Sequence, residues 1–138
     1  MKLDSLEPEF KAIVEQVIMG AEIATGLHWI ATSCRRTIAE QNALYAQGRT
    51  TKGQIVTEAK GGQSPHNFGL GCDLAPMKDG KIWWNAPDII WKQMADVAVG
   101  LGLTAGYYFK SFKDMPHIES TRWKAVQADW KAGKIQVA

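Results

Sequence analysis

Cysteine is scarce in this sequence: there are two residues, Cys34 and Cys72, and they form no Cys-x-x-Cys pair. Two cysteines are too few for a disulfide framework. We therefore expect both to be reduced thiols that are buried in the core. A chain of 138 residues is long enough to bury such a core without disulfides, and its length fits one domain, residues 1–138.

Neither sign of charge predominates, because 16 Lys and Arg residues stand against 14 Asp and Glu residues. The formal net charge of +2 supplies no broad positive field, so no nucleic-acid partner is expected. No run approaches the roughly 18 apolar residues of a membrane span. Acidic residues also interrupt the start of the chain, where a secretory signal would be apolar. We expect a protein that is made in the cytoplasm without a signal peptide and has no integral membrane segment.

Apolar residues recur at helical spacing in several segments. The expected helices are 10–26, 37–47, 85–102 and a short last one over 123–130. Thr37-Ile38-Ala39-Glu40 has the form of a capping box, which marks the start of the second helix. Gly26 is a typical helix stop for the first.

Short apolar runs predict strands at 27–33, 71–76, 81–84, 107–112 and 116–119. The Asp79-Gly80 pair favours a hairpin between the second and the third. Segment 49–63 is polar and lacks periodicity, which is typical of a long surface loop, and such loops are often functional. Helices mixed with antiparallel strands, without regular βαβ alternation, indicate an α+β domain with a small antiparallel sheet flanked by helices.

Two histidines and two acidic residues lie in short segments that contain glycine or proline. The glycines between His66 and Asp73 allow the chain to turn and bring both side chains to one point. The proline just before His117 excludes an unbroken helix there, so a turn can aim Asp114 and His117 into one cleft. Two imidazoles and one carboxylate are a ligand set that catalytic zinc takes, with a fourth position left for water. The sequence thus predicts zinc bound by His66, Asp73 and His117, with Asp114 beside it as base.

Two further residues have alternative interpretations. For His28 we favour a hydrogen-bonded role in the core or at the surface. Glu119 shares the strand face of His117, so it can hold that histidine, bind the metal itself, or be a solvated charge. We favour the first or the last of these for Glu119.

The pattern Ser-x-His-x-x-Gly-x-x-x-Asp at 64–73, followed by Asp-x-x-His at 114–117, resembles the zinc peptidases that include bacterial D-alanyl-D-alanine carboxypeptidases and phage L-alanyl-D-glutamate endolysins. Upstream, segment 32–37 and the helix after it resemble the family's Ser-Gly-Tyr-Arg-Thr segment and the helix that follows. The similarity covers most of the chain, 33–119. It implies the fold that these peptidases share with hedgehog-type signalling domains.

The resemblance implies the same three zinc ligands and Asp114 as the catalytic carboxylate. It also implies that Arg36 polarises the scissile carbonyl and stabilises its oxyanion, and that Ser64 helps to position the substrate backbone. Three positions depart from the family pattern: Cys34 replaces the usual Gly, Arg35 replaces the usual aromatic residue, and Gly71 replaces the usual Ala. The smaller residue at 71 is expected to leave the ligands in place.

The activity that the resemblance implies is zinc-dependent cleavage of the stem peptide of bacterial peptidoglycan. The Asp-x-x-His form, the small size and the start of the chain favour an L-alanyl-D-glutamate endopeptidase that acts at the cell wall as a phage endolysin. We expect a monomer. A D-alanyl-D-alanine carboxypeptidase is the second candidate, and a non-catalytic zinc-containing binding domain is a third, which the presence of both Asp114 and Arg36 disfavours. The basic segment 121–138 is interpreted as a packed final helix rather than a contact for an anionic envelope.

Overall fold

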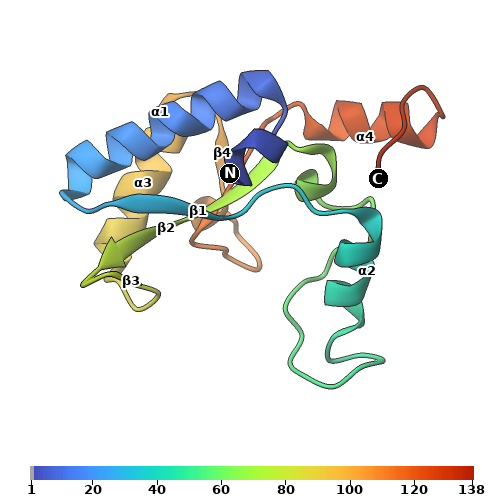
Figure 1. Cartoon of the computed structure of the whole chain (residues 1–138), viewed down its shortest axis with the longest axis horizontal. Coiled ribbons are helices and arrows are strands. Elements are labelled where there is room, and N and C mark those ends of the chain that lie inside the picture. The colour runs from blue at the N-terminus through green and yellow to red at the C-terminus, as the bar shows by residue number, and fades with distance from the viewer. Residues whose placement is uncertain (1) are drawn as a thin grey trace.

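A small antiparallel sheet crosses the middle of the molecule in the computed structural model, which describes residues 2–138 (Figure 1). Its strands are β1 Trp29–Ser33, β2 Gly71–Lys78, β3 Lys81–Ile82, β4 Thr104–Ala105 and β5 His117–Glu119. The order is β1-β2-β5-β4, and β3 pairs with the end of β2. Strand β2 is therefore central, with β1 on one side of it and β5 on the other.

Helices cover the sheet and extend beyond one end of it. The α-helices are α1 Pro8–Thr25, α2 Ile38–Ala46, α3 Asp88–Gly100 and α4 Trp123–Lys131, and the 3-10 helices are η1 Lys2–Ser5, η2 Pro65–Phe68 and η3 Gly106–Tyr108. Helices α1 and α3 pack against each other beside the strands, whereas α2 and the loop after it project away from the sheet (Figure 1). None of the helices in residues 2–138 combines the length and the apolar character that a bilayer crossing requires.

The core lies between the two long helices and the sheet. One face of α1 and one face of α3 are buried, each with helical spacing; these residues are Phe10, Val14, Val17 and Ala21, and Trp91, Met94, Ala95 and Ala98. Trp29 at the start of β1 packs edge-on against Trp91, with ring centroids 5.9 Å apart. Burial of this apolar surface fixes the sheet against the helices and so holds β2 in place.

Most of the expected elements are confirmed, together with the α+β fold class. Gly26 ends α1 in the left-handed conformation at a φ of 69°. Both hydrogen bonds of the capping box between Thr37 and Glu40 are present at the start of α2. The hairpin turns at Asp79 and Gly80, which both have positive φ. Segment 49–63 contains no helix or strand.

The strand expected at 107–112 is wrong. Strand β4 lies earlier, and η3 followed by irregular chain occupies this segment. The aromatic residues that suggested a strand bind α3 instead, because the hydroxyl groups of Tyr107 and Tyr108 donate hydrogen bonds to Asp88 and Asp96. Tertiary contacts of two side chains thus outweigh the strand propensity of the segment.

Candidate active site

One cleft collects every site residue that the sequence predicts. Its volume is about 360 Å³, and Arg36, Ser64, His66, Asp73, Asp114 and His117 all line it. These residues come from the entry to α2, the start of η2, strand β2, the turn before β5, and β5 itself. Segments far apart in the sequence therefore meet at one end of the sheet.

Three of these side chains form a group that can bind a metal ion. His66, Asp73 and His117 each offer a ligand atom, and these atoms lie within 4.8 Å of one another. Asp73 Oδ1 is 3.0 Å from His117 Nδ1 and 3.4 Å from His66 Nε2. Asp73 and His117 are direct partners across β2 and β5, so their side chains point to the same face. Two imidazole nitrogens and one carboxylate oxygen fit the donor set of catalytic zinc.

The short helix η2 places His66. The Ser64 hydroxyl accepts a hydrogen bond from the His66 backbone N–H at 3.2 Å, which caps the helix, and Gly69 ends it in the left-handed conformation. The backbone N–H of Arg36 donates to the His66 carbonyl at 3.0 Å. Ser64 therefore has a structural role in this cleft, and its role toward a substrate stays a prediction.

Hydrogen bonds from outside the cluster orient both imidazole rings. His66 Nδ1 lies 2.6 Å from the Cys34 carbonyl oxygen. A carbonyl only accepts hydrogen bonds, so Nδ1 donates to it, and Nε2 faces Asp73. On the other ring, His117 Nε2 lies 2.7 Å from Glu119, whose second carboxylate oxygen accepts a bond from Trp123 Nε1 at 2.8 Å.

Glu119 is thus held on both sides, and its carboxylate is mostly buried, with 15% of the side chain exposed. The alternative of a solvated surface charge is therefore wrong. When a carboxylate accepts a hydrogen bond from the outer nitrogen of a metal-binding histidine, it fixes the ring and makes the inner nitrogen more basic, and so a better metal ligand. The Glu119 and Trp123 pair was not recognisable as a unit from the sequence, because strand spacing gave only the shared face of Glu119 and His117.

The charges in the cleft shift the pKa values of its acidic and imidazole groups. Burial by itself raises the pKa of Asp73, but hydrogen bonds from His117 and His66 outweigh it and hold that pKa well below its usual range. Burial lowers the pKa of His117, whereas hydrogen bonds to Asp73 and Glu119 more than compensate and raise it to about 9. Burial also raises the pKa of Asp114, an effect that the neighbouring charge of His117 reduces but does not cancel.

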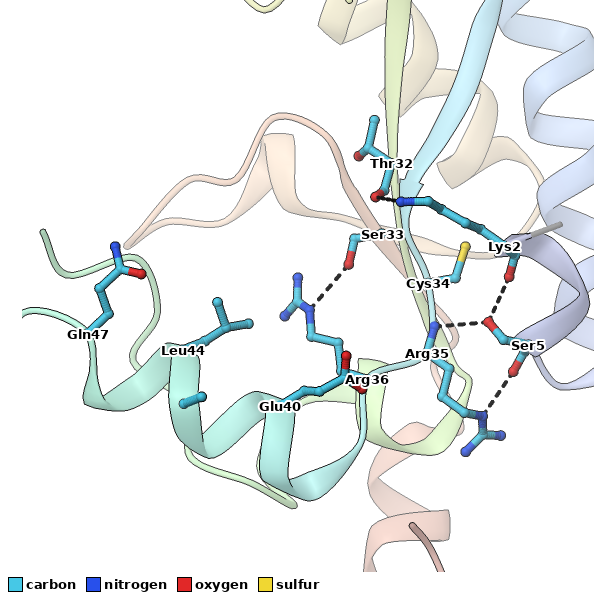
Figure 2. A pocket seen from close by; sticks show the side chains of 11 residues that line it. Lys2, Ser5, Thr32, Ser33, Cys34, Arg35, Arg36, Glu40, Leu44 and Gln47 are labelled. Carbon is cyan, nitrogen blue, oxygen red and sulfur yellow. Dashed lines mark hydrogen bonds between the residues drawn. The ribbon is translucent and has the colours of Figure 1, made fainter. Parts of the chain in front are cut away.

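Arg36 is fixed by three contacts. Its Nη2 lies 3.5 Å from Asp73 Oδ2. Its Nε donates to Ser33 Oγ at 3.2 Å, a hydrogen bond that is drawn in Figure 2. Its Nη1 donates to Gln41 Oε1 at 3.1 Å, and Gln41 in turn donates from Nε2 to the Ala59 carbonyl at 2.8 Å. The fully buried Gln41 thus links the arginine to the long loop 49–63. This role of Gln41 was not predictable from the sequence, because a polar residue in a helix is usually exposed.

A tight turn brings Asp114 beside the three candidate metal ligands. The His117 N–H donates to the Asp114 carbonyl at 3.2 Å, and the Asp114 N–H donates to the Gly106 carbonyl at 2.9 Å. A Cβ atom added to Gly106 would lie 2.3 Å from the Asp114 carbonyl oxygen and 3.0 Å from His117 Cβ. Only glycine at 106 allows this close approach.

His28 and two tryptophans lie outside the cleft. His28 is paired with Glu22 at 2.8 Å near the end of α1, so its interpretation as a hydrogen-bonded structural residue is confirmed. Trp91 is buried in the core and Trp84 stacks on it, and neither of them lines the cleft. The final helix α4 packs through Trp130 against Phe68, as expected for a packed helix.

A His-Asp-His cluster that shares its cleft with a second carboxylate and an arginine is typical of metal-dependent hydrolases. The profile of a family described as D-alanyl-D-alanine carboxypeptidase matches residues 57–120, which contain every predicted site residue except Arg36. The chain is 42% identical over 102 residues to the peptidoglycan L-alanyl-D-glutamate endopeptidase CwlK of Bacillus subtilis (strain 168). The chain belongs to this peptidase family. The match covers 68% of the chain and 61% of CwlK, so the chain spans less than two thirds of that relative.

Solved structures of similar proteins have the same fold. The L-Ala D-Glu endopeptidase ChiX of Serratia marcescens superposes with a TM-score of 0.62 at 20% identity, covering 90% of this chain and 86% of ChiX. DacB of Streptococcus pneumoniae D39 gives 0.61 at 20% identity, with 93% and 77% covered. The vancomycin-resistance D,D-pentapeptidase VanY, solved with Zn(II), gives 0.61 at 14% identity, with 93% and 79% covered. These likenesses confirm the fold that the sequence resemblance implied.

Gly106→Ala is expected to displace the Asp114 turn, because the new methyl group would overlap a backbone oxygen. We expect a loss of about 1–3 kcal/mol in the free energy of unfolding, measured by denaturant titration. Gly100→Ala is the matched control, since a Cβ at Gly100 meets no heavy atom within 4 Å. Equal stability of the two variants would contradict the close approach.

Glu119→Ala is expected to weaken zinc binding by about 10–100-fold, because His117 loses the acceptor for its outer nitrogen. A competition titration with a chromophoric chelator measures the affinity. Glu119→Gln keeps a neutral acceptor and should lose less. Glu15→Ala, on the exposed side of α1, serves as the control and should bind zinc like the unaltered protein. An unchanged affinity in Glu119→Ala would show that the contact does not support the ligand.

Proposed function

We propose that this protein is a zinc-dependent peptidase that cleaves the stem peptide of bacterial peptidoglycan at the L-alanyl-D-glutamate bond. The observation that carries the proposal is the gathering of His66, Asp73 and His117 in one cleft with Asp114 and Arg36. The similarity to CwlK, which is named as an endopeptidase for this bond, supports the choice of substrate.

The proposed chemistry assigns a separate task to each group. Zinc, when bound, supplies a Lewis acid that polarises a carbonyl oxygen and lowers the pKa of water. Asp114 accepts the proton of the attacking water and returns it to the leaving amine, a role that suits a carboxyl group whose pKa is raised by burial. Arg36 donates hydrogen bonds to the oxygen that becomes negatively charged during the attack. The contacts of Arg36 to Ser33 and Gln41 hold the guanidinium in place before the substrate binds.

Asp114→Ala should bind zinc normally but hydrolyse peptidoglycan about 10²–10⁴-fold more slowly, because it lacks the group that transfers the proton. Metal content and turnover are measured on the same preparation. Asp129→Ala, in the exposed part of α4, is the control and should retain full activity. Near-normal turnover in Asp114→Ala would remove this residue from the mechanism.

His66→Ala should lose both the metal and the activity, since two remaining ligands rarely hold catalytic zinc securely. Elemental analysis after dialysis gives the zinc content. His28→Ala removes a histidine that lies outside the cleft and should keep stoichiometric zinc. If His66→Ala also keeps it, the ligand assignment fails.

The bond that is cut distinguishes two candidate activities. Mass spectrometry of purified peptidoglycan after digestion should show new amino-terminal D-Glu residues. The description of the matched family supports the second candidate, a D-alanyl-D-alanine carboxypeptidase, which would release free D-Ala instead. Zinc-dependent clearing of a wall suspension would exclude a non-catalytic binding domain.

We also propose a role in phage lysis, with action at the cell wall as a monomer. The Asp-x-x-His form at 114–117 resembles the endolysin branch and supports this role. Lysis of bacteria whose outer layers have been made permeable tests the lytic role. Size-exclusion chromatography tests whether the protein is a monomer.

A further inference from the structure

Two thiols that the proposed reaction does not use lie in contact directly behind the metal ligands. Cys34 Sγ and Cys72 Sγ are 3.4 Å apart, and both residues are buried and free. This confirms the expected burial of the cysteines. A disulfide bond is about 2.05 Å long, so the two sulfur atoms are about 1.4 Å from bonding distance.

The strand register explains why the thiols meet. Ser33 and Asp73 are the last register partners of β1 and β2, after an irregularity between Ala31 and Ser33; Cys34 directly follows β1, and Cys72 precedes Asp73 on β2. Opposite residues of antiparallel strands have Cβ atoms about 4.5–5.5 Å apart, and a disulfide needs about 3.5–4.5 Å. A bond between them therefore requires side-chain rotation and a small backbone shift rather than refolding. Because side chains alternate along a strand, Asp73 faces the cleft while Cys72 faces the core.

Cys34 lies nearer to solvent than Cys72, although both are buried. Cys34 lines a pocket of about 520 Å³ between η1 and α2, and 4% of the residue is exposed, against 0% of Cys72. Figure 2 shows the Cys34 side chain at the wall of this pocket, close to the side chain of Lys2. The Lys2 ammonium group donates a hydrogen bond to the Thr32 carbonyl. We therefore expect a small oxidant to react with Cys34 first. The Cys72 sulfur is close enough to react with the oxidised Cys34 sulfur afterwards.

We propose that Cys34 and Cys72 are a dithiol that hydrogen peroxide oxidises to an intramolecular disulfide. The Cys34 sulfur, after losing its proton, attacks one peroxide oxygen, the O–O bond breaks, and hydroxide leaves, which gives a sulfenic acid. The Cys72 sulfur then attacks the Cys34 sulfur, the S–O bond breaks, and water leaves. Two thiols and one peroxide become one disulfide and two waters, so the two electrons lost by sulfur reduce the peroxide.

The disulfide would join the two segments that hold the metal site. The Cys34 carbonyl accepts the hydrogen bond from His66, and Cys72 is bonded through the peptide chain to Asp73. The cross-link closes a loop between residues 38 apart in sequence, which restricts the unfolded chain. We expect the midpoint of thermal unfolding to rise by about 5–15 °C on oxidation. This inference goes beyond the proposed function, and its test needs neither substrate nor turnover.

The experiment treats the reduced, zinc-loaded full chain with hydrogen peroxide and then removes the oxidant. Thiols titrated after denaturation should fall from two to none, and the intact mass should fall by that of two hydrogen atoms. A peptide map should contain a Cys34–Cys72 cross-link that a reductant removes. Persistence of both thiols, oxygen added to either cysteine in the peptide map, or a disulfide-linked dimer would each overturn the proposal.

Cys34→Ala and Cys72→Ala, the matched controls, should form no intramolecular disulfide and should show no rise in the thermal midpoint. A similar rise in either variant would mean that the cross-link is not its cause, and a disulfide that forms in the unaltered protein without any rise would refute the stabilising role. The mass and thiol measurements use the unaltered protein, so they decide the chemical step even if a variant does not fold.

Discussion

The site depends on the pairing of Asp73 with His117 across β2 and β5. A carboxylate in a mostly buried position is costly to ionise unless it is paired and hydrogen-bonded, and here two imidazoles supply those contacts. Since the two residues are register partners, their approach follows from backbone pairing rather than from loop conformation. A shift of one residue in this register would turn the side chain of Asp73 or His117 toward the core and separate the two residues. The pairing of β2 with β5 therefore both stabilises the short sheet and sets the geometry of the candidate metal site.

Contacts behind the cluster extend this constraint through the fold. The Cys34 carbonyl from the end of β1 orients one ring, and Glu119 with Trp123 orients the other. These acceptors belong to rigid or buried parts of the molecule, so the rings are oriented before any ligand arrives. The same arrangement leaves the inner nitrogen atoms facing the cleft, where they serve as metal ligands in the proposed enzyme.

Local patterns in the sequence were sufficient for most of the helices and for the hairpin, whereas the prediction that His66, Asp73 and His117 lie together also drew on the family resemblance. The capping box at Thr37, the stop at Gly26 and the Asp79-Gly80 turn depend on neighbouring residues only, and each is present as expected. Features that depend on partners distant in the sequence were not predictable. The tyrosines after β4 bind α3 instead of forming a strand, and Gln41 is buried because Arg36 and the long loop both need its amide. Nothing in local spacing reports such partners.

The contact from Gln41 to the Ala59 carbonyl has a consequence for sequence variation in this wall of the cleft. The amide binds a main-chain oxygen, which every amino acid has, so the anchor does not depend on the side chain at 59. Neighbouring positions other than Thr57, whose hydroxyl also accepts a hydrogen bond from Gln41 at 3.4 Å, can therefore be exchanged to suit a different peptide while the guanidinium of Arg36 keeps its place. The loop residues that contact a substrate can thus change during evolution while Arg36 keeps its position, although both line the same side of the cleft.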